Sequence, residues 1–318
     1  MLRPRSQLQV EVLEDRSVPA VTVLGANAAD VSITGDNQSN DITVTLTTQG
    51  IQVQANGPNT TLALNPSTPA NWIVTNTSSL IILNPNGPNQ PPTLDNLYIS
   101  MLNGDDKVSI GACTINNNLV IRDSPGGNDI VIIDNTIVGN NTYIYLTRGN
   151  DKVFLTSSRF TQDVFINTAG GHDVVRFIPG TVIVGGNLGI YTGGGNDRVF
   201  VDPSSAVTLQ VFGTTSIQTG LGDDFVRFGA PSSPGSTVNL QGGTVIDTGA
   251  GNDRIYMRNA FMSLLVALLG DGNDKVDNNW GTDNVTVGSG SLLDGGKGTD
   301  ILPPGWTPPA NLTVINIP

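Results

Sequence analysis

The 318-residue chain has little of what most catalytic and metal sites depend on: one cysteine, one histidine and only two glutamates. The single Cys113 excludes an internal disulfide, and we expect it to be a small core residue. The single His172 excludes a multi-histidine metal site. No run approaches 18 apolar residues, so no transmembrane helix is expected. Three Trp and five Tyr suggest that aromatic platforms for sugars are sparse.

The absence of glutamate from the body of the chain is informative about fold. Of the 27 acidic residues 25 are Asp, and both glutamates lie in the first fifteen residues. Glu favours helices, whereas Asp favours turns and caps. Abundant Thr, Val, Ile and Asn, with 38 Gly and 19 Pro, predict strands and turns. The net charge of −12 disfavours binding to nucleic acid and favours cations as partners.

A turn of the form Gly-x-Asp recurs nine times, at intervals of 21 to 29 residues. A Gly stands two residues before the Asp in every copy, which indicates positive φ or a very close backbone approach. The nine Asp are Asp106, Asp129, Asp151, Asp173, Asp197, Asp224, Asp253, Asp274 and Asp300.

Aliphatic columns accompany this turn. The residue two positions after the Asp is aliphatic in all nine copies, from Val108 to Leu302, and the residue directly after it is often Lys or Arg. Each turn therefore opens a strand with its charged side out and its aliphatic side in. A further inward column, from Ile99 to Ile246, lies seven residues before the Asp in six of the copies.

One such repeat cannot bury its own apolar face, but stacked repeats can. The sequence therefore predicts an all-β fold, a parallel β-solenoid (β-helix) with about nine or more coils of 21–29 residues. At about 4.8 Å per coil, nine coils form a rod on the order of 40 Å long. The expected organisation is a leader segment (1–20), a strand-rich cap with degenerate coils (21–98), the solenoid (99–302) and a Pro-rich tail with one last strand (303–318).

The last five turns carry a second glycine, four residues before the Asp. The first four copies have other residues there, Leu102 to Ala169, whereas the later turns read GGGND, GLGDD, GAGND, GDGND and GKGTD. The five additional glycines are Gly193, Gly220, Gly249, Gly270 and Gly296.

These later turns resemble the RTX (haemolysin-type) calcium-binding repeats, whose nonapeptide is GGxGxDxUx. The resemblance implies Ca²⁺ as a bound ion, held by the Asp carboxylate and the glycine carbonyls, which are suitable hard oxygen ligands. The RTX turns recur every nine residues, whereas this chain has one turn per coil. Carried over position by position, the candidate metal ligands are Asp197, Asp224, Asp253, Asp274 and Asp300 with Gly193, Gly220, Gly249, Gly270 and Gly296.

A purely structural interpretation of the turn competes with calcium. The carboxylate would accept backbone N–H groups of its own turn, and the residue before it, which is often Asn, would form side-chain ladders. His172 takes the place of one such Asn and is expected to be a tolerated surface substitution. Extra acids in the last coils favour the cation instead, namely Asp223, Asp271, Asp277, Asp283 and Asp294.

The N-terminal stretch LEDRSVPA resembles a short motif of large repetitive exported proteins of planctomycete bacteria, although Glu11, Glu14, Asp15 and Arg16 interrupt any apolar signal core. The resemblance implies export or surface display, and a plain leader is the alternative.

The function that we predict is an exported or cell-surface structural or adhesive solenoid, with Ca²⁺ and a surface or matrix polysaccharide or protein as partners. The alternative is a β-helix enzyme that acts on polysaccharides, either a lyase or a glycosidase. Such a site needs carboxylates, or a carboxylate with a basic residue, clustered on one lateral face. Asp163, Asp202 and Asp247 are scattered single residues, so we expect no catalytic residues and no enzyme activity.

Overall fold

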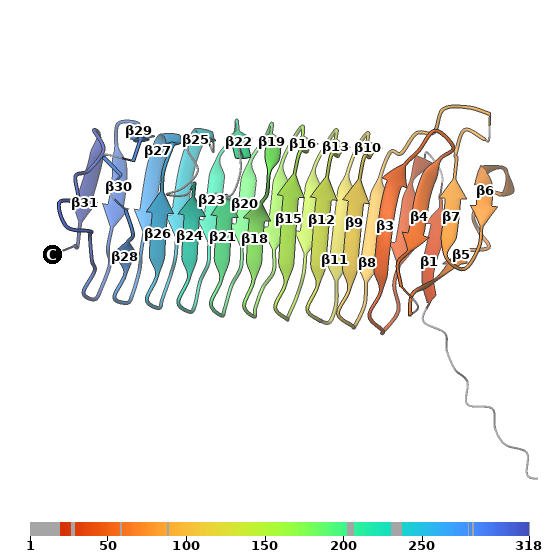
Figure 1. The fold of residues 1–318 in the computed structure, drawn as a ribbon, viewed down its shortest axis with the longest axis horizontal. Coiled ribbons are helices and arrows are strands. Elements are labelled where there is room, and N and C mark those ends of the chain that lie inside the picture. Colours follow the sequence, from red (N-terminus) through yellow and green to blue (C-terminus); the bar gives the residue numbers. More distant parts are fainter. Residues whose placement is uncertain are drawn as a thin grey trace, which may run out of the picture.

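The protein forms one elongated stack of β-coils, seen in a computed structural model that describes residues 20–26, 29–57, 59–87, 89–201, 207–229, 237–278, 280–281 and 283–317 (Figure 1). The leader at 1–19, the loop at 231–235 and Asp202 lie outside the described residues. Almost every element is a strand, and the body consists of parallel strands stacked coil upon coil. The predicted parallel β-solenoid is confirmed.

Each coil contributes a strand to three parallel columns. The first column begins directly after the Gly-x-Asp turn. It consists of β9 (Lys107–Gly111), β12 (Ile130–Asp134), β15 (Lys152–Thr156), β18 (Val174–Phe177), β21 (Arg198–Val201), β24 (Phe225–Phe228), β26 (Arg254–Met257) and β28 (Lys275–Val276).

The second column is made of short strands, and the third leads back into the next turn. The second contains β10 (Thr114–Ile115), β13 (Ile137–Val138), β16 (Arg159–Phe160), β19 (Gly180–Val184), β22 (Val207–Val211) and β29 (Val285–Val287). The third contains β8 (Leu97–Met101), β11 (Leu119–Asp123), β14 (Thr142–Tyr145), β17 (Val164–Asn167), β20 (Leu188–Tyr191), β23 (Thr215–Gln218), β30 (Ser291–Asp294) and β31 (Leu312–Ile315), while β25 (Thr237–Asp247) and β27 (Ala260–Leu268) span both columns.

The in-register pairing turns the sequence columns into ladders of like side chains. Val108, Val131 and Val153 face one another on consecutive coils and are at most 2% exposed. The inward column that ends before the turn is buried in the same way, for example Ile144 and Ile166. Cys113 is also in this core at 2% exposed. Each Å² of apolar surface buried in such a ladder stabilises the fold by roughly 25 cal/mol, and this burial is the main contribution to the stability of the stack.

Residues 20–83 continue the rod but change its strand direction. The strands are β1 (Ala20–Gly25), β2 (Val31–Thr34), β3 (Asp41–Leu46), β4 (Ile51–Ala55), β5 (Thr61–Leu64), β6 (Ile73–Asn76) and β7 (Leu80–Leu83), with a short 3₁₀ helix η2 at Ala70–Trp72. β2 and β3 pair in parallel with β8 and β9, whereas β3–β4, β4–β7, β6–β7 and β1–β2 are antiparallel. These antiparallel strands cover the edge of the solenoid, which limits edge-to-edge association.

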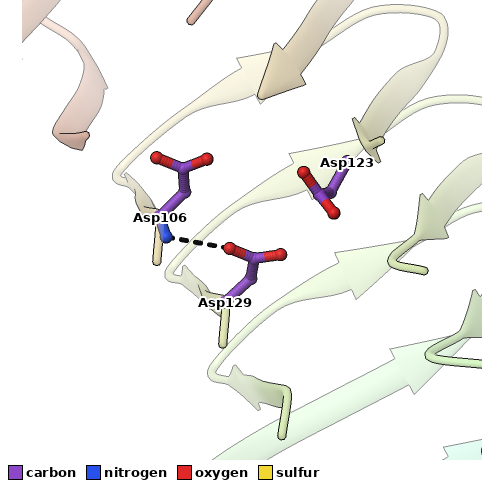
Figure 2. Close-up of side chains that lie close together, drawn as sticks. All are labelled: Asp106, Asp123 and Asp129. Carbon is purple, nitrogen blue, oxygen red and sulfur yellow. Dashed lines mark hydrogen bonds between the residues drawn. The ribbon is translucent and has the colours of Figure 1, made fainter. Parts of the chain in front are cut away.

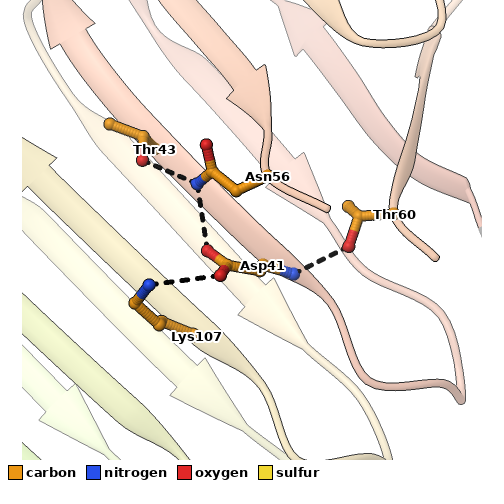
Figure 3. A network of polar contacts seen from close by, with 5 residues as sticks. All are labelled: Asp41, Thr43, Asn56, Thr60 and Lys107. Atoms are coloured by element: carbon orange, nitrogen blue, oxygen red, sulfur yellow. Dashed lines mark hydrogen bonds and ion pairs between the residues drawn. The ribbon is translucent and has the colours of Figure 1, made fainter. Parts of the chain in front are cut away.

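A polar network joins this cap to the first full coil (Figure 3). Asp41 lies opposite Lys107, and its carboxylate accepts from the Lys107 Nζ at 3.1 Å and from the Asn56 Nδ2 at 3.0 Å. The Asp41 N–H donates to the Thr60 hydroxyl at 2.9 Å, while Asn56 also donates to Thr43 at 2.8 Å. The network therefore fixes the register of β3 on β9.

At the other end β31 pairs in parallel with β30, as expected of one last strand in the tail. Trp280 is fully buried in the final coils, and its ring lies edge-on to Trp306 at 6.2 Å. Within the described residues no helix is long and apolar enough to cross a bilayer.

Candidate functional site

The nine aspartates of the Gly-x-Asp turn form one continuous ladder inside the rod. Each is at most 5% exposed. The Oδ1 of Asp129 accepts the backbone N–H of Asp106 at 2.8 Å, and the same bond repeats along the stack to Asp300, which accepts the N–H of Asp274 at 3.0 Å. The carboxylates are therefore N–H acceptors, as the structural interpretation predicted, but the donor belongs to the preceding coil rather than to the carboxylate's own turn.

The ladder extends one coil into the cap. The N–H of Asn40 donates to the Oδ1 of Asp106 at 2.6 Å, and Asn40 is 1% exposed. Asn40, not its neighbour Asp41, therefore occupies the ladder position directly before β3.

The second carboxylate oxygen of each ladder aspartate has no hydrogen-bond partner among the described residues, in all nine coils. Burial raises the pKa of the first eight of these carboxyls, from Asp106 to Asp274, to about 7 for Asp106 and Asp151, about 8 for Asp129 and about 6 for Asp274. Without a bound cation these eight carboxyls therefore hold protons near neutral pH, because a buried carboxylate without a counter-charge is costly.

The glycine two residues before each aspartate is required by close approach. A Cβ at Gly149 would lie 1.5 Å from the carbonyl oxygen of Gly127, and one at Gly298 would lie 1.4 Å from that of Gly272. Seven of the nine glycines have a positive φ, whereas Gly127 and Gly272 do not. Close approach thus explains all nine copies, and positive φ explains most of them.

Close backbone approach and positive φ also explain the second glycine of the last five turns. Gly249 has φ +92°, and a Cβ there would lie 2.0 Å from the carbonyl oxygen of Gly220. Ala169 occupies this column in the coil before the first such glycine and has φ +64°. The carbonyl groups of Gly193, Gly220, Gly249 and Gly270 accept N–H groups of the next coil at 2.8–2.9 Å. Four of the five glycine carbonyls predicted as calcium ligands therefore already accept a hydrogen bond between coils.

The residue before each aspartate forms a second ladder that runs in the opposite direction. The N–H of Asn150 donates to the Oδ1 of Asn128, and that of His172 to the Oδ1 of Asn150, at 2.8 and 2.7 Å. The Nδ1 of His172 then accepts the N–H of Asn196 at 2.7 Å. His172 is exposed and replaces an Asn in the ladder, in line with a tolerated surface substitution.

The extra acids of the last coils have partners of their own. Asp277 forms ion pairs with Arg254 and Lys275 at 2.6 and 3.0 Å, and Asp271 pairs with Lys297 at 3.1 Å. Each of the other three accepts a hydrogen bond from a neighbouring coil or turn: Asp223 from Asn252 N–H, Asp283 from Asn278 and Asp294 from Asn316. Their negative charge is therefore shared with cationic or N–H groups outside the inner ladder.

A third ladder, at the corner before the third column, was missed at the sequence level. The N–H of Asn118 donates to the Oδ1 of Asn96, and the chain of bonds continues through Asn141 and Asp163 to Asn187. Asp163, interpreted as a scattered single residue, belongs to this ladder. The recurrence of Asn, once replaced by Asp, at intervals of 22 to 24 residues was the available signal.

One further acid, Asp123, lies beside the inner ladder without being part of it, and it too was missed. Asp123, the last residue of β11, lies with Asp106 and Asp129 in a buried group whose ligand oxygens are all within 4.8 Å of one another. Figure 2 shows Asp106 and Asp129 stacked after the turn, with Asp123 facing them from the strand before it. It is the only group of three or more acidic, His or Cys side chains with such spacing among the described residues.

Aromatic side chains gather on the outer face of the third column. Ring centroids of neighbouring residues are 5.0–6.2 Å apart, and the guanidinium of Arg122 lies 5.5 Å from the Tyr145 ring. We call this set the aromatic row: Tyr143, Tyr145, Phe165 and Tyr191, with Tyr98 near its N-terminal end. Four of the five tyrosines thus share one face, so aromatic platforms are less sparse than the composition suggested.

Comparisons with known proteins identify no relative: no family model, no curated protein and no solved structure matches the chain.

Proposed function

We propose that the chain is an exported or surface-displayed structural and adhesive rod. The observation that carries this proposal is the inner aspartate ladder, which runs unbroken through nine coils and uses one oxygen of each carboxylate to bond neighbouring coils. A hydrogen bond that repeats between every pair of neighbouring coils stabilises a long rod, since each coil contacts only its neighbours.

Calcium at the last five turns is part of the proposal. Its support is the unpartnered, buried Oδ2 atom of Asp197, Asp224, Asp253, Asp274 and Asp300. Oxygen ligands of this kind suit Ca²⁺. The same unpartnered atom occurs in the first four coils, so the carboxylates alone do not single out the last five.

A calcium titration tests this part. The protein, dialysed against chelator at pH 8, is titrated to millimolar Ca²⁺ while its thermal unfolding midpoint is followed. A ligand that binds only the folded state raises the midpoint. A midpoint that does not move at any Ca²⁺ concentration would contradict calcium binding and leave the rod proposal standing.

The adhesive surface in this proposal is the aromatic row. Its side chains are half-buried and their rings lie over the sheet, where Gly189 leaves room: a Cβ there would lie 3.0 Å from the Tyr191 ring. The adjoining groove of about 380 Å³ is lined by Ser32, Thr34 and Arg122 among others. Aromatic faces beside hydroxyl groups are suited to a polysaccharide, whose sugar rings combine apolar faces with hydroxyls.

Sedimentation with insoluble polysaccharides tests the adhesive surface. We expect the double substitution of Tyr145 and Phe165 by Ala to reduce the bound fraction at least tenfold. Phe212→Ala is the matched control, because Phe212 is 47% exposed and lies in the turn after β22, outside the row. Equal binding by wild type and the double variant, or equal loss in the control, would refute the assignment of this face.

An enzyme is the weaker alternative. The one convergent group of carboxylates in the described part of the chain lies inside the rod and not on a lateral face. Reproducible cleavage of a polysaccharide, lost on substitution of a single lateral Asp, would overturn this preference.

A further inference from the structure

The coil that contains Asp123 departs from the others in two ways. Its turn, between Asp123 and Asp129, is one residue longer than the turn from Leu146 to Asp151. Asp123 pairs with Met101 of the coil before it, and Leu146 is the equivalent residue of the coil after it. Asp123 therefore occupies an inward column. Elsewhere this column holds only neutral side chains: Met101, Leu146, Thr168, Thr192, Thr219, Thr248 and Leu269.

Asp123 is not a ladder residue, and one of its carboxylate oxygens lacks a partner within the described part of the chain. Its side chain is 4% exposed, and its Oδ1 has no hydrogen-bond partner among the described residues. The Oδ2 accepts the Thr147 hydroxyl, at 3.2 Å. Across the turn, the Oδ2 atoms of Asp106 and Asp129 are likewise buried and without a partner. Three carboxylates, each with one buried oxygen that lacks a partner, thus meet in one place, and no other such group of three occurs among the described residues.

We propose that Asp106, Asp123 and Asp129 form a binding site for a hard divalent cation, with calcium as its best fit. Ligand oxygens of one ion can be no farther apart than twice the bond length, which is about 4.6–5.2 Å for Ca²⁺ and about 4.0–4.2 Å for Mg²⁺. All the ligand oxygens lie within 4.8 Å of one another, a span that one calcium ion can bridge. Calcium also accepts irregular sites built from protein oxygens, whereas magnesium demands near-ideal octahedral geometry and keeps several waters. This site lies in the first coils, away from the turns that resemble RTX repeats, so it does not depend on their binding calcium.

The charge of the group supports a cation over a structural role. Removing one carboxylate from a buried acidic group normally relieves repulsion, so Asp123 adds a cost that Thr or Leu avoids in the other coils. A bound divalent ion would offset this cost by supplying the counter-charge that the described neighbours of the three carboxylates do not provide.

The test compares wild type with Asp123→Thr, which installs the residue that four other coils carry. Calcium bound at pH 7.5 is counted by equilibrium dialysis and metal analysis, with MgCl₂ as a parallel arm. We expect Asp123→Thr to bind one equivalent of Ca²⁺ fewer than wild type and to melt at a higher temperature in chelator. Magnesium should bind at least tenfold more weakly.

Two further variants keep the result decisive. Asp123→Asn, of nearly the same shape, should lose the same equivalent. Asp173→Asn, at a buried ladder residue outside both candidate calcium sites, should retain it. Far-UV circular dichroism shows that each variant is folded. Equal calcium content in wild type and both Asp123 variants would overturn the site. So would wild type that binds no calcium and whose melting temperature depends on pH alone.

Discussion

The first four Gly-x-Asp turns and the last five differ in sequence but share one inner architecture. Both groups have the same carboxylate-to-N–H ladder and the same unpartnered Oδ2 atoms. What differs is the second glycine of the last five turns. A Cβ at this position would lie 1.7–2.0 Å from a carbonyl oxygen of the preceding coil, so only glycine fits. A motif match can therefore mark tight packing as well as an ion site.

The largest expected effect separates packing from calcium binding at the second glycine. We expect Gly249→Ala to lower the free energy of unfolding by about 3 kcal/mol or more in chelator, because the methyl group meets the Gly220 carbonyl at a positive φ. The reverse change at the upstream boundary, Ala169→Gly, should stabilise by up to about 1 kcal/mol. Denaturant unfolding measures both. A Gly249→Ala protein that is as stable as wild type without calcium would favour the ion as the reason for this glycine.

The pH dependence of stability comes next and concerns both groups of coils. The folded-state pKa values of about 6 to 8 lie above the unfolded value of 3.8, so the folded state binds more protons. The contribution of these carboxyls to the free energy of unfolding is therefore fully present below about pH 4, and it is lost as the pH rises through 6 to 8. In chelator we expect the melting temperature to fall by about 5–10 °C from pH 5 to pH 8. A melting temperature that stays constant or rises from pH 5 to pH 8 would contradict the raised pKa values of the buried ladder carboxyls.

Neutralising one ladder residue in each group sharpens the comparison further. Asp151→Asn and Asp253→Asn keep the Oδ1 acceptor, as Asn40 does naturally, and remove a buried charge. At pH 8 in chelator each should stabilise the protein by about 1 kcal/mol. If the later turns bind calcium, only Asp253→Asn should also diminish the calcium-induced rise in melting temperature. The calcium part fails if both variants respond to the ion as wild type does.

The smallest effect is expected for the exposed ladder. His172→Asn restores the residue type of the neighbouring coils and keeps an acceptor for the Asn196 N–H. We expect a change in the free energy of unfolding within about 0.5 kcal/mol. A larger loss, measured in denaturant, would show that the histidine has a role beyond the ladder.

The columns of the repeat were predictable because stacking imposes the same environment on every copy. The inward positions of Val108 and Ile144 and the turn glycines followed from within-chain repetition alone. The donor to each carboxylate was not predictable, since a sequence column does not tell whether an acceptor serves its own turn or the coil before it.

Asp123 was missed for a different physical reason. The additional residue in its turn moves it to six positions before Asp129, so alignment on the ladder aspartate hides it from the inward column. The aromatic row needed the register between coils, because Tyr145 and Phe165 are twenty residues apart and meet only through the pairing of β14 with β17.

The central claim is that the ladder aspartate is architectural in all nine coils, and paired alanine variants test it most directly. Asp151→Ala and Asp253→Ala each leave a buried N–H of the preceding coil without its acceptor. At pH 5 in chelator, where the carboxyls are largely protonated and calcium is absent, both should lose about 2 kcal/mol of unfolding free energy, within 1 kcal/mol of each other. An Asp253→Ala protein as stable as wild type under these conditions, beside a destabilised Asp151→Ala, would contradict the claim and assign the later aspartates to the ion.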